Sequence, residues 1–295
     1  MAEHFVRPPE WTWYILSYFF LAGLTGGLYA IGTMLRLWGR PGDEAAARTA
    51  FLWAFPILIV CPILLTLDLG HPLRFWHMLT NTTPTERGLI LRNWIPMSVG
   101  SWALPLYGIF AFVSFLEALG PCYPVGRSVA AALAGGAGRI VNVAGALLGL
   151  FVASYTGVLL SVSNQPVWSD TWTLGGLFLA SGLSGAAALL AVVSRRDEAG
   201  AGTGARLQLA DGYFTLIELV WILLFFATLA AAGTLPMVLR APWIVLWLIV
   251  AIGLIPPLMV LARRDRSHAD ATLAAALVLV GVLALRAVII FSAQV

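Results

Sequence analysis

The sequence contains no lysine and few charged residues of any kind. Only 11% of its 295 residues are Asp, Glu, Lys or Arg, whereas 60% are hydrophobic and the mean hydropathy is +0.89. A soluble domain is about half apolar and about a quarter charged. The scarcity of charge therefore excludes a soluble globular domain. The arginines flank apolar runs, as they do at membrane boundaries, and do not indicate a nucleic-acid partner.

Cysteine and histidine are also scarce. The two cysteines, Cys61 and Cys122, lack the spacing of a metal or Fe–S ligand set. A membrane cytochrome b holds its haem with imidazoles inside the helix bundle. All four histidines lie outside the apolar centres of the hydrophobic runs: His4, His71, His77 and His268. We therefore expect no haem, no Fe–S cluster and no metal in this chain, so any electrons must come from a partner.

Long hydrophobic runs dominate the sequence. A bilayer core needs about 20 apolar residues per helix, and the runs here are too long, and too uniformly apolar, for the alternating strands of a barrel. We predict an all-α polytopic membrane protein with eight transmembrane helices, at residues 11–37, 51–68, 94–119, 138–163, 171–194, 213–235, 241–262 and 269–292.

The arginines predict the orientation of these spans. The first apolar run lacks a small-residue cleavage site, so we interpret it as a retained span and not as a signal peptide. Connections after odd-numbered spans carry eleven arginines, and the opposite side carries five. Because arginine accumulates on the cytoplasmic side, both termini are expected on the outer side of the membrane.

The sequence divides at a Gly/Ala-rich stretch, residues 195–212, which resembles a cytoplasmic linker. The linker separates an N-terminal transmembrane half, residues 1–194 with spans one to five, from a C-terminal half, residues 213–295 with spans six to eight.

A possible internal repeat relates span one to span five. An offset of 159 residues matches Trp13 with Trp172 and aligns the run Gly23-Leu24-Thr25-Gly26 with Gly182-Leu183-Ser184-Gly185. Both spans run inward, so the repeat would be parallel and would predict two four-helix bundles. Chance recurrence of small residues in packed membrane helices is the alternative.

Ionisable residues inside spans are costly, about 2.5–3.5 kcal/mol each at mid-membrane, so each requires a reason. Asp68 and Arg286 lie at comparable depth near the outer ends of their spans. They could form a structural ion pair, or a proton-accepting carboxylate tuned by a guanidinium. Glu117 is interpreted as a solvated helix end, and Glu218 could serve a proton path from the cytoplasm.

Polar side chains also gather near the outer ends of spans one and four. The Tyr155 hydroxyl must find a hydrogen-bond partner at that depth. Tyr14, Ser17 and Tyr18 lie at the same level, so these residues and Asp68 could converge on one pocket. An ordinary aromatic belt is the alternative. His71 follows Asp68 closely and is either part of this pocket or an interfacial packing residue.

Several motifs resemble the NrfD/PsrC-type family of membrane subunits. They are LTLDLGHPLRFWHML, which contains Asp68, and IPMSVGSWALPLYG at residues 95–108. A third stretch, residues 154–189, contains a YTG element and a P-x-W element. The N-terminal WTWYILSYFFLAGLTGG and the final ALRAVIIFS fit as well. The resemblance covers the whole sequence, with eight spans as in the polysulfide reductase anchor.

The resemblance implies a haem-free quinone- or quinol-reactive subunit of the bacterial inner membrane, with both termini periplasmic and menaquinone or ubiquinone as the exchangeable ligand. Its partners would be a periplasmic four-cluster Fe–S subunit and a molybdopterin catalytic subunit. Tyr155 would hydrogen-bond a quinone carbonyl, and Asp68 would accept or relay a proton. Relatives carry Asn or His on span one where this sequence offers Tyr14, Ser17, Tyr18 and Thr25, and His71 could substitute as the second headgroup partner. We expect partner docking at Arg74, Trp76, His77 and Arg87.

A second interpretation is a transporter or a proton- or ion-translocating subunit without quinone chemistry of its own. Prolines interrupt spans two and seven, as they do in transporters, but no polar residues accompany them: Pro56, Pro62, Pro256 and Pro257. In a hybrid of the two interpretations, quinone chemistry is coupled to proton transfer through Glu218 and Arg286.

Overall fold

The computed structural model describes residues 9–81, 88–194, 201–263 and 271–294, with nothing assigned to the side chains of Ala201 and Arg263. Its elements are α1 (Trp13–Trp38), η1 (Pro41–Asp43), α2 (Glu44–Asp68), η2 (Pro72–Met78), β1 (Thr80–Asn81), β2 (Gly88–Leu89), α3 (Pro96–Ala118), α4 (Pro124–Ala132), α5 (Gly136–Ser161), α6 (Leu174–Val193), α7 (Ala201–Ala232), α8 (Leu235–Leu239), α9 (Trp243–Arg263) and α10 (Ala271–Ser292).

Eight helices in the described part are long and apolar enough to cross a membrane: α1, α2, α3, α5, α6, α7, α9 and α10. The only paired strands among the described residues, β1 and β2, form a hairpin of two residues each. The predicted all-α polytopic fold with eight spans is therefore confirmed.

Two helices begin earlier than the hydrophobic runs predict. Helix α2 begins at residue 44 instead of 51, and α7 begins at residue 201 instead of 213. Their first turns are polar but compensated, because Arg36 pairs with Glu44 at 2.8 Å and Arg206 pairs with the buried Asp43. Residues 201–212 are thus the first turns of α7 and not part of a linker.

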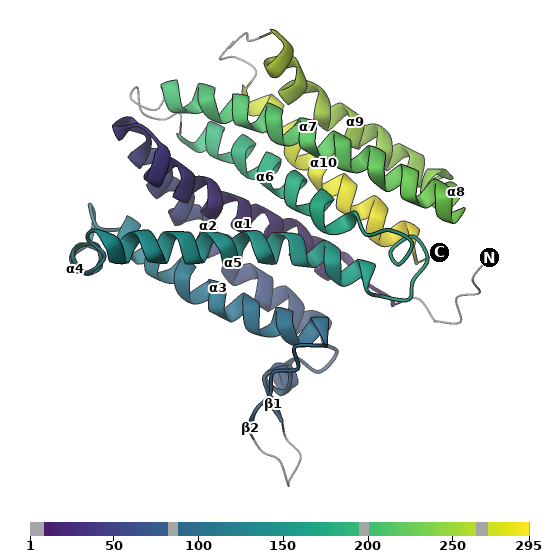
Figure 1. The fold of residues 1–295 in the computed structure, drawn as a ribbon, viewed down its shortest axis with the longest axis horizontal. Helices are drawn as coiled ribbons and strands as arrows, with labels where there is room; N and C mark the ends of the chain where they lie inside the picture. Colours follow the sequence, from purple (N-terminus) through teal and green to yellow (C-terminus); the bar gives the residue numbers. More distant parts are fainter. Residues whose placement is uncertain (1–8, 82–87, 195–200, 264–270, 295) are drawn as a thin grey trace.

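The spans form two four-helix bundles (Figure 1). Helices α1, α2, α3 and α5 pack in a ring, and α6, α7, α9 and α10 pack in a second ring. The predicted pair of bundles is confirmed. The boundary between the two rings falls between α5 and α6, whereas the predicted division places span five in the N-terminal half. Helix α6 also contacts α1 and α5, because its small residues allow close approach on more than one side.

The helices alternate in direction, so each bundle has two ends. We call the end at which α1 begins the Trp13 end and the end at which it finishes the Trp38 end. The Trp13 end is held together by Trp11, whose amide donates to the side chain of Gln294, just after α10, and whose ring stacks on Trp168. The topology prediction assigns the Trp13 end to the periplasm and the Trp38 end to the cytoplasm.

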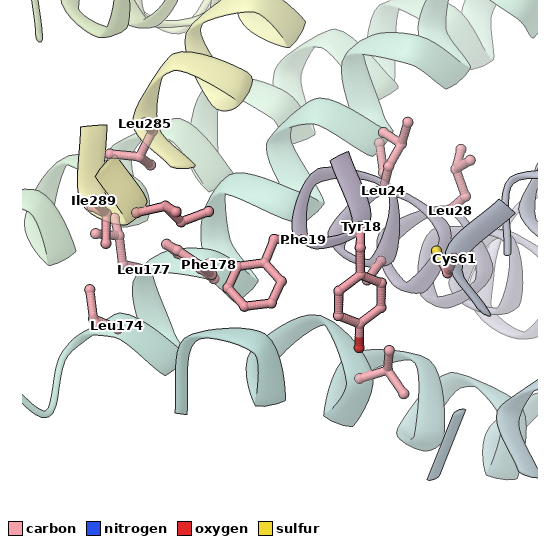
Figure 2. Packing of buried hydrophobic residues seen from close by; sticks show 14 of the residues in the cluster. Tyr18, Phe19, Leu24, Leu28, Cys61, Leu174, Leu177, Phe178, Leu285 and Ile289 are labelled. Carbon is pink, nitrogen blue, oxygen red and sulfur yellow. The ribbon is translucent and has the colours of Figure 1, made fainter. Parts of the chain in front are cut away.

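The junction between the bundles brings together positions that the 159-residue offset relates. Phe19 and Phe178 face one another with ring centroids 6.0 Å apart (Figure 2). A methyl group on Gly182 would lie 2.9 Å from the carbonyl oxygen of Gly23, so α1 and α6 touch through their backbones. Matched residues that meet across one interface are the arrangement expected of a parallel repeat about a local two-fold axis.

Candidate functional site

Tyr155 fastens α5 to the start of α3 at the Trp13 end. Its side chain is 7% exposed, and its hydroxyl donates to the carbonyl of Pro96 at 2.6 Å. Gly100 lies against the same ring, where any Cβ would collide with Tyr155. Gly157 lies equally close to the backbone of Leu174, at the start of α6, and a Cβ there would collide with it. The YTG element and the IPMSVG element are therefore held together by direct contact.

This bond limits what Tyr155 can do. A phenol has one hydrogen to donate, and Tyr155 gives it to Pro96, so the hydroxyl oxygen is left as an acceptor. It can accept from the hydroxyl of a quinol without any rearrangement. Donation to a quinone carbonyl, the role that the resemblance implied, requires the Pro96 bond to open.

Tyr18 is the polar residue of α1 that lies near the Tyr155 side chain. Its side chain is 5% exposed, and it lies close enough to Cys61 and Tyr155 to interact with both electrostatically. Figure 2 shows the ring beside Cys61, with the hydroxyl oxygen directed away from α1 toward a neighbouring helix. Within the described part of the protein this hydroxyl makes no hydrogen bond, although buried hydroxyls normally have one.

Tyr14 and Ser17 belong to the same side of α1. Residues three and four apart share a helix face, so Tyr14 lies one turn from Tyr18 toward the Trp13 end. Both Tyr14 and Ser17 are partly buried, and the Tyr14 ring stacks on Trp13 with centroids 4.0 Å apart. Of Tyr14, Ser17 and Tyr18, Tyr18 alone is buried and close to Tyr155.

Asp68 is the last residue of α2 and is partly buried. It lies seven residues beyond Cys61, on the same face of the helix and about 10 Å closer to the Trp13 end. It forms no hydrogen bond or ion pair with any described residue, and it stands where the helix dipole is negative. An unpaired carboxylate at a helix C-terminus is a favourable place for a proton.

The expected pairing of Asp68 with Arg286 is not present. Arg286 is fully buried on α10 at the junction of the bundles, where its guanidinium donates to the carbonyls of Phe19 and Phe178 at 3.1 and 3.2 Å. It also donates to Ser181 Oγ at 3.0 Å. Arg286 therefore donates hydrogen bonds to backbone carbonyls from both bundles. The carboxylate that interacts with its charge is Glu218 of α7.

Glu218 is part of a buried acidic line on α7 that the sequence only partly revealed. Glu218 is 2% exposed and Asp211 is 6% exposed. Asp211 accepts from Ser184 at 2.7 Å and from Thr215 at 3.4 Å. Asp211 was missed because residues 195–212 were assigned to the linker, although the spacing Asp211, Thr215, Glu218 follows one helix face.

Residues 69–81 and 88–94 lie at the Trp13 end, beyond α2, and most of them are exposed. Their large apolar side chains are open, with Leu73 88% and Trp94 76% exposed. Three of the predicted docking residues lie exposed in η2: Arg74, Trp76 and His77. Arg87 lies outside the described residues. His71 is exposed in the turn before η2, so it is not brought into the group around Tyr18.

Metal ligation finds no support in the described helices, where no group of three or more His, Cys, Asp or Glu could hold an ion. The residues gathered at the Trp13 end of the first bundle fit a small polar headgroup better. Tyr18 offers a free hydroxyl, Tyr155 an acceptor oxygen and Asp68 an unpaired carboxylate. The surrounding surface is apolar, as such binding sites require.

Known proteins resemble this one over different extents. The family model described as "Polysulphide reductase, NrfD" matches residues 3–295. "Protein NrfD" of Escherichia coli is 28% identical over 96% of this protein and 95% of that protein. The C chain of the polysulfide reductase of Wolinella succinogenes is 31% identical over 59% of this protein and 55% of its own length. The C subunit of the selenate reductase of Mesobacillus selenatarsenatis is 28% identical over 37% of this protein.

The last two alignments are partial, since the matched stretch spans 55% of the polysulfide reductase protein and 22% of the selenate reductase protein. The family match, in contrast, covers almost every residue and agrees with eight apolar helices in two bundles. The chain belongs to the NrfD family of multi-pass membrane proteins.

Proposed function

We propose that this protein is the haem-free quinone- or quinol-reactive membrane subunit of a reductase complex, with its site at the Trp13 end of the first bundle. The observation that carries the proposal is the Tyr18 hydroxyl, which is buried beside Tyr155 and has no hydrogen-bond partner among the described residues. A ligand oxygen at this position would give the hydroxyl the hydrogen-bond partner that it lacks.

The protein's own groups suit a two-proton, two-electron carrier such as menaquinone or ubiquinone. A bound quinol supplies both electrons and both protons. Tyr18 can donate to one ring oxygen, while Tyr155 accepts from a ligand hydroxyl and keeps its bond to Pro96. Asp68, about two turns further out, can take up the two released protons one after the other and pass each to water at the membrane surface. Leu64 and Val152, buried one turn from Cys61 and Tyr155, provide apolar walls.

The Trp13 end would face the periplasm of a bacterial inner membrane, with both termini on that side. Described arginines at the ends of the bundles support this orientation. The Trp38 end carries Arg36, Arg40, Arg48, Arg127, Arg139 and Arg206, whereas the Trp13 end carries Arg74, Arg92 and Arg240. Six against three follows the positive-inside rule.

The partner surface would be formed by the exposed residues within 69–81 and 88–94. Large open apolar side chains next to arginines are typical of protein contacts. The relatives named as parts of polysulfide and selenate reductases support assembly with a catalytic subunit. The partner in contact would be an Fe–S subunit of a molybdopterin oxidoreductase, which brings its nearest cluster close to Asp68 and exchanges electrons with the bound carrier.

The test uses the full-length protein purified in mild detergent with its co-purifying subunits. Quinol-linked turnover should fall about tenfold in Tyr18→Phe, as expected for one lost hydrogen bond in the reacting complex. Asp68→Asn should lower turnover as well, because the amide cannot take a proton. Tyr123→Phe is the matched control, since Tyr123 is 57% exposed at the Trp38 end. Unchanged turnover in both site variants, or a haem band in the absorbance spectrum, would reject the proposal.

A second candidate function, proton translocation, is favoured by the acidic line on α7. Asp211, Glu218 and Arg286 follow one another through the second bundle, and Arg286 bonds the carbonyl of Phe19, the neighbour of Tyr18. A small cavity of about 20 Å³ adjoins Asp211, roughly the space of one water molecule. Protons could therefore enter from the Trp38 end and reach the junction between the bundles.

Liposomes containing the complex distinguish the two functions. Glu218→Gln and Asp211→Asn keep the volume of each side chain but remove its exchangeable proton. If the second bundle carries protons, both variants should lose proton uptake from the Trp38 side, measured with a pH-sensitive dye, while electron transfer continues. Equal proton-to-electron ratios in wild type and variants would eliminate proton transfer through this line.

A further inference from the structure

A polar cavity of about 290 Å³ lies at the Trp38 end of the first bundle, opposite the proposed quinone site. It is formed by the end of α1, the end of α3 and the start of α5, and residues 133–135, between α4 and α5, contribute to its rim. Its polar lining consists of Arg36, Glu117, Arg139 and Asn142. None of these groups takes part in the function proposed above.

Asn142 is the feature of this cavity that points to a ligand. Its side chain is 5% exposed and lines the cavity, yet it makes no hydrogen bond within the described part of the protein. Only its backbone carbonyl is engaged, accepting from Thr33 at 3.2 Å. A buried carboxamide normally has partners for its donors, so an acceptor in the cavity would complete it.

The charges around Asn142 favour an anion. Arg36 donates to Glu117 at 2.5 Å and to Glu44 at 2.8 Å, and each terminal nitrogen retains a second N–H group. Arg139 lines the cavity and has no carboxylate partner among the described residues. With Glu117 neutralised by Arg36, the unbalanced charge of the lining is the positive charge of Arg139.

The start of α5 adds further donors. Helix α5 begins at Gly136 after Gly135, which has a φ of +77° and provides no side-chain cap. The first N–H groups of a helix have no partners within the helix and carry a partial positive charge. They lie at the edge of the cavity, beside Arg139 and Asn142.

An apolar stripe leads away from the cavity along the outside of α5. Ile140 is 70% exposed, Val143 40% and Leu147 63%, and their spacing of three and four residues places them on one face. Anion-binding groups followed by an exposed apolar face match an amphiphile and not a free ion.

We propose that this cavity binds the phosphate group of an anionic phospholipid, whose acyl chains lie along Ile140, Val143 and Leu147. The Trp38 end is the arginine-rich end and the one predicted to face the anionic cytoplasmic leaflet, where basic pockets between helices bind such headgroups. The lipid joins α1 and α5 through Arg36, Arg139 and Asn142. This proposal is independent of the quinone site.

Native mass spectrometry of the purified full-length protein tests the proposal. Delipidated protein is titrated with phosphatidylglycerol and, separately, with phosphatidylcholine of the same acyl chains. Phosphatidylglycerol should bind at least about tenfold more tightly, and Arg139→Gln and Asn142→Leu should each weaken it about tenfold, the effect of one lost charge-assisted hydrogen bond. Arg127→Gln is the matched control, because Arg127 is exposed on α4 at the same end but does not line the cavity.

Three results would overturn the proposal. The first is equal binding of the two lipids, and the second is a loss in Arg127→Gln as large as in Arg139→Gln. The third is displacement of the lipid by inorganic phosphate at equal concentration, which would show a site for a free anion. Because Arg139 is exposed, Arg139→Gln is expected to fold whether or not the lipid binds. The lipid affinity of Asn142→Leu is interpreted only if its thermal midpoint equals that of Arg139→Gln.

Discussion

The two bundles share one plan of packing but bury different polar groups. Within its spans the first bundle buries neutral hydroxyls: Tyr29 bonds Ser114 at 2.6 Å, and Tyr107 bonds the backbone carbonyl of Thr25 at 2.9 Å. Its buried carboxylate, Asp43, lies in η1 between two spans. The second bundle buries Asp211, Glu218 and Arg286. Charged groups inside a membrane are far more costly than satisfied hydroxyls, so the difference agrees with the two functions proposed for the bundles. The first bundle is suited to binding a neutral headgroup, and the second to moving or balancing charge.

The largest expected effect concerns Arg286, the residue at which the bundles meet. Replacing it by leucine in Arg286→Leu removes the hydrogen bonds that the guanidinium donates to the carbonyls of Phe19 and Phe178, and it leaves Glu218 without a nearby cation. Loss of one member of a buried charged network costs about 3–5 kcal/mol. We expect a corresponding loss in the free energy of unfolding, measured in detergent micelles.

A double substitution isolates the charge contribution of this network. If Glu218 is destabilised by the loss of Arg286, the pair Arg286→Leu with Glu218→Leu should be more stable than Arg286→Leu alone. Additive effects of the two substitutions would show that Arg286 acts only through the backbone carbonyls. The charges of Glu218 and Arg286 would then not stabilise one another in the second bundle.

A smaller effect is expected at the backbone contact between α1 and α6. In Gly182→Ala the new methyl group would lie 2.9 Å from the Gly23 carbonyl oxygen, which forces the bundles apart. Overpacking of this kind costs about 1–3 kcal/mol. Gly185→Ala is the matched control on the same helix, because its methyl group would meet neighbours only at 3.5 Å and beyond. Equal thermal midpoints for the two variants would disprove the tight junction.

The eight spans and the two bundles were predictable because they depend on long apolar runs and on a repeat of small residues. The polar first turns of α2 and α7 were not, since they depend on partners distant in sequence: Glu44 on Arg36, and Asp43 on Arg206. A hydropathy pattern records the apolar part of a helix and does not detect an ion pair that extends it.

The candidate site was predictable in its location but not in its hydrogen bonds. The motifs place Tyr155 and the span-one residues at one level, but only the structure shows that Tyr155 donates to Pro96 and that Tyr18 has no described partner. The pairing of Asp68 with Arg286 was wrong, because similar depth on two helices does not determine their separation across a bundle. Arg286 was instead needed at the junction of α1 and α6.

The smallest effect compares two buried tyrosines within the first bundle, and it separates structural hydroxyls from a ligand-binding one. Tyr107→Phe removes a hydroxyl bonded to the backbone and side chain of Thr25, and should lower the free energy of unfolding by about 1 kcal/mol with turnover retained. Tyr18→Phe removes a hydroxyl with no described partner, so the free energy of unfolding should be nearly unchanged while turnover falls. Added quinone should stabilise the wild type and the Tyr107 variant equally, and the Tyr18 variant less. If Tyr18→Phe instead destabilises the ligand-free protein as much as Tyr107→Phe does, the Tyr18 hydroxyl has a structural role, and its assignment as a ligand-binding group is wrong.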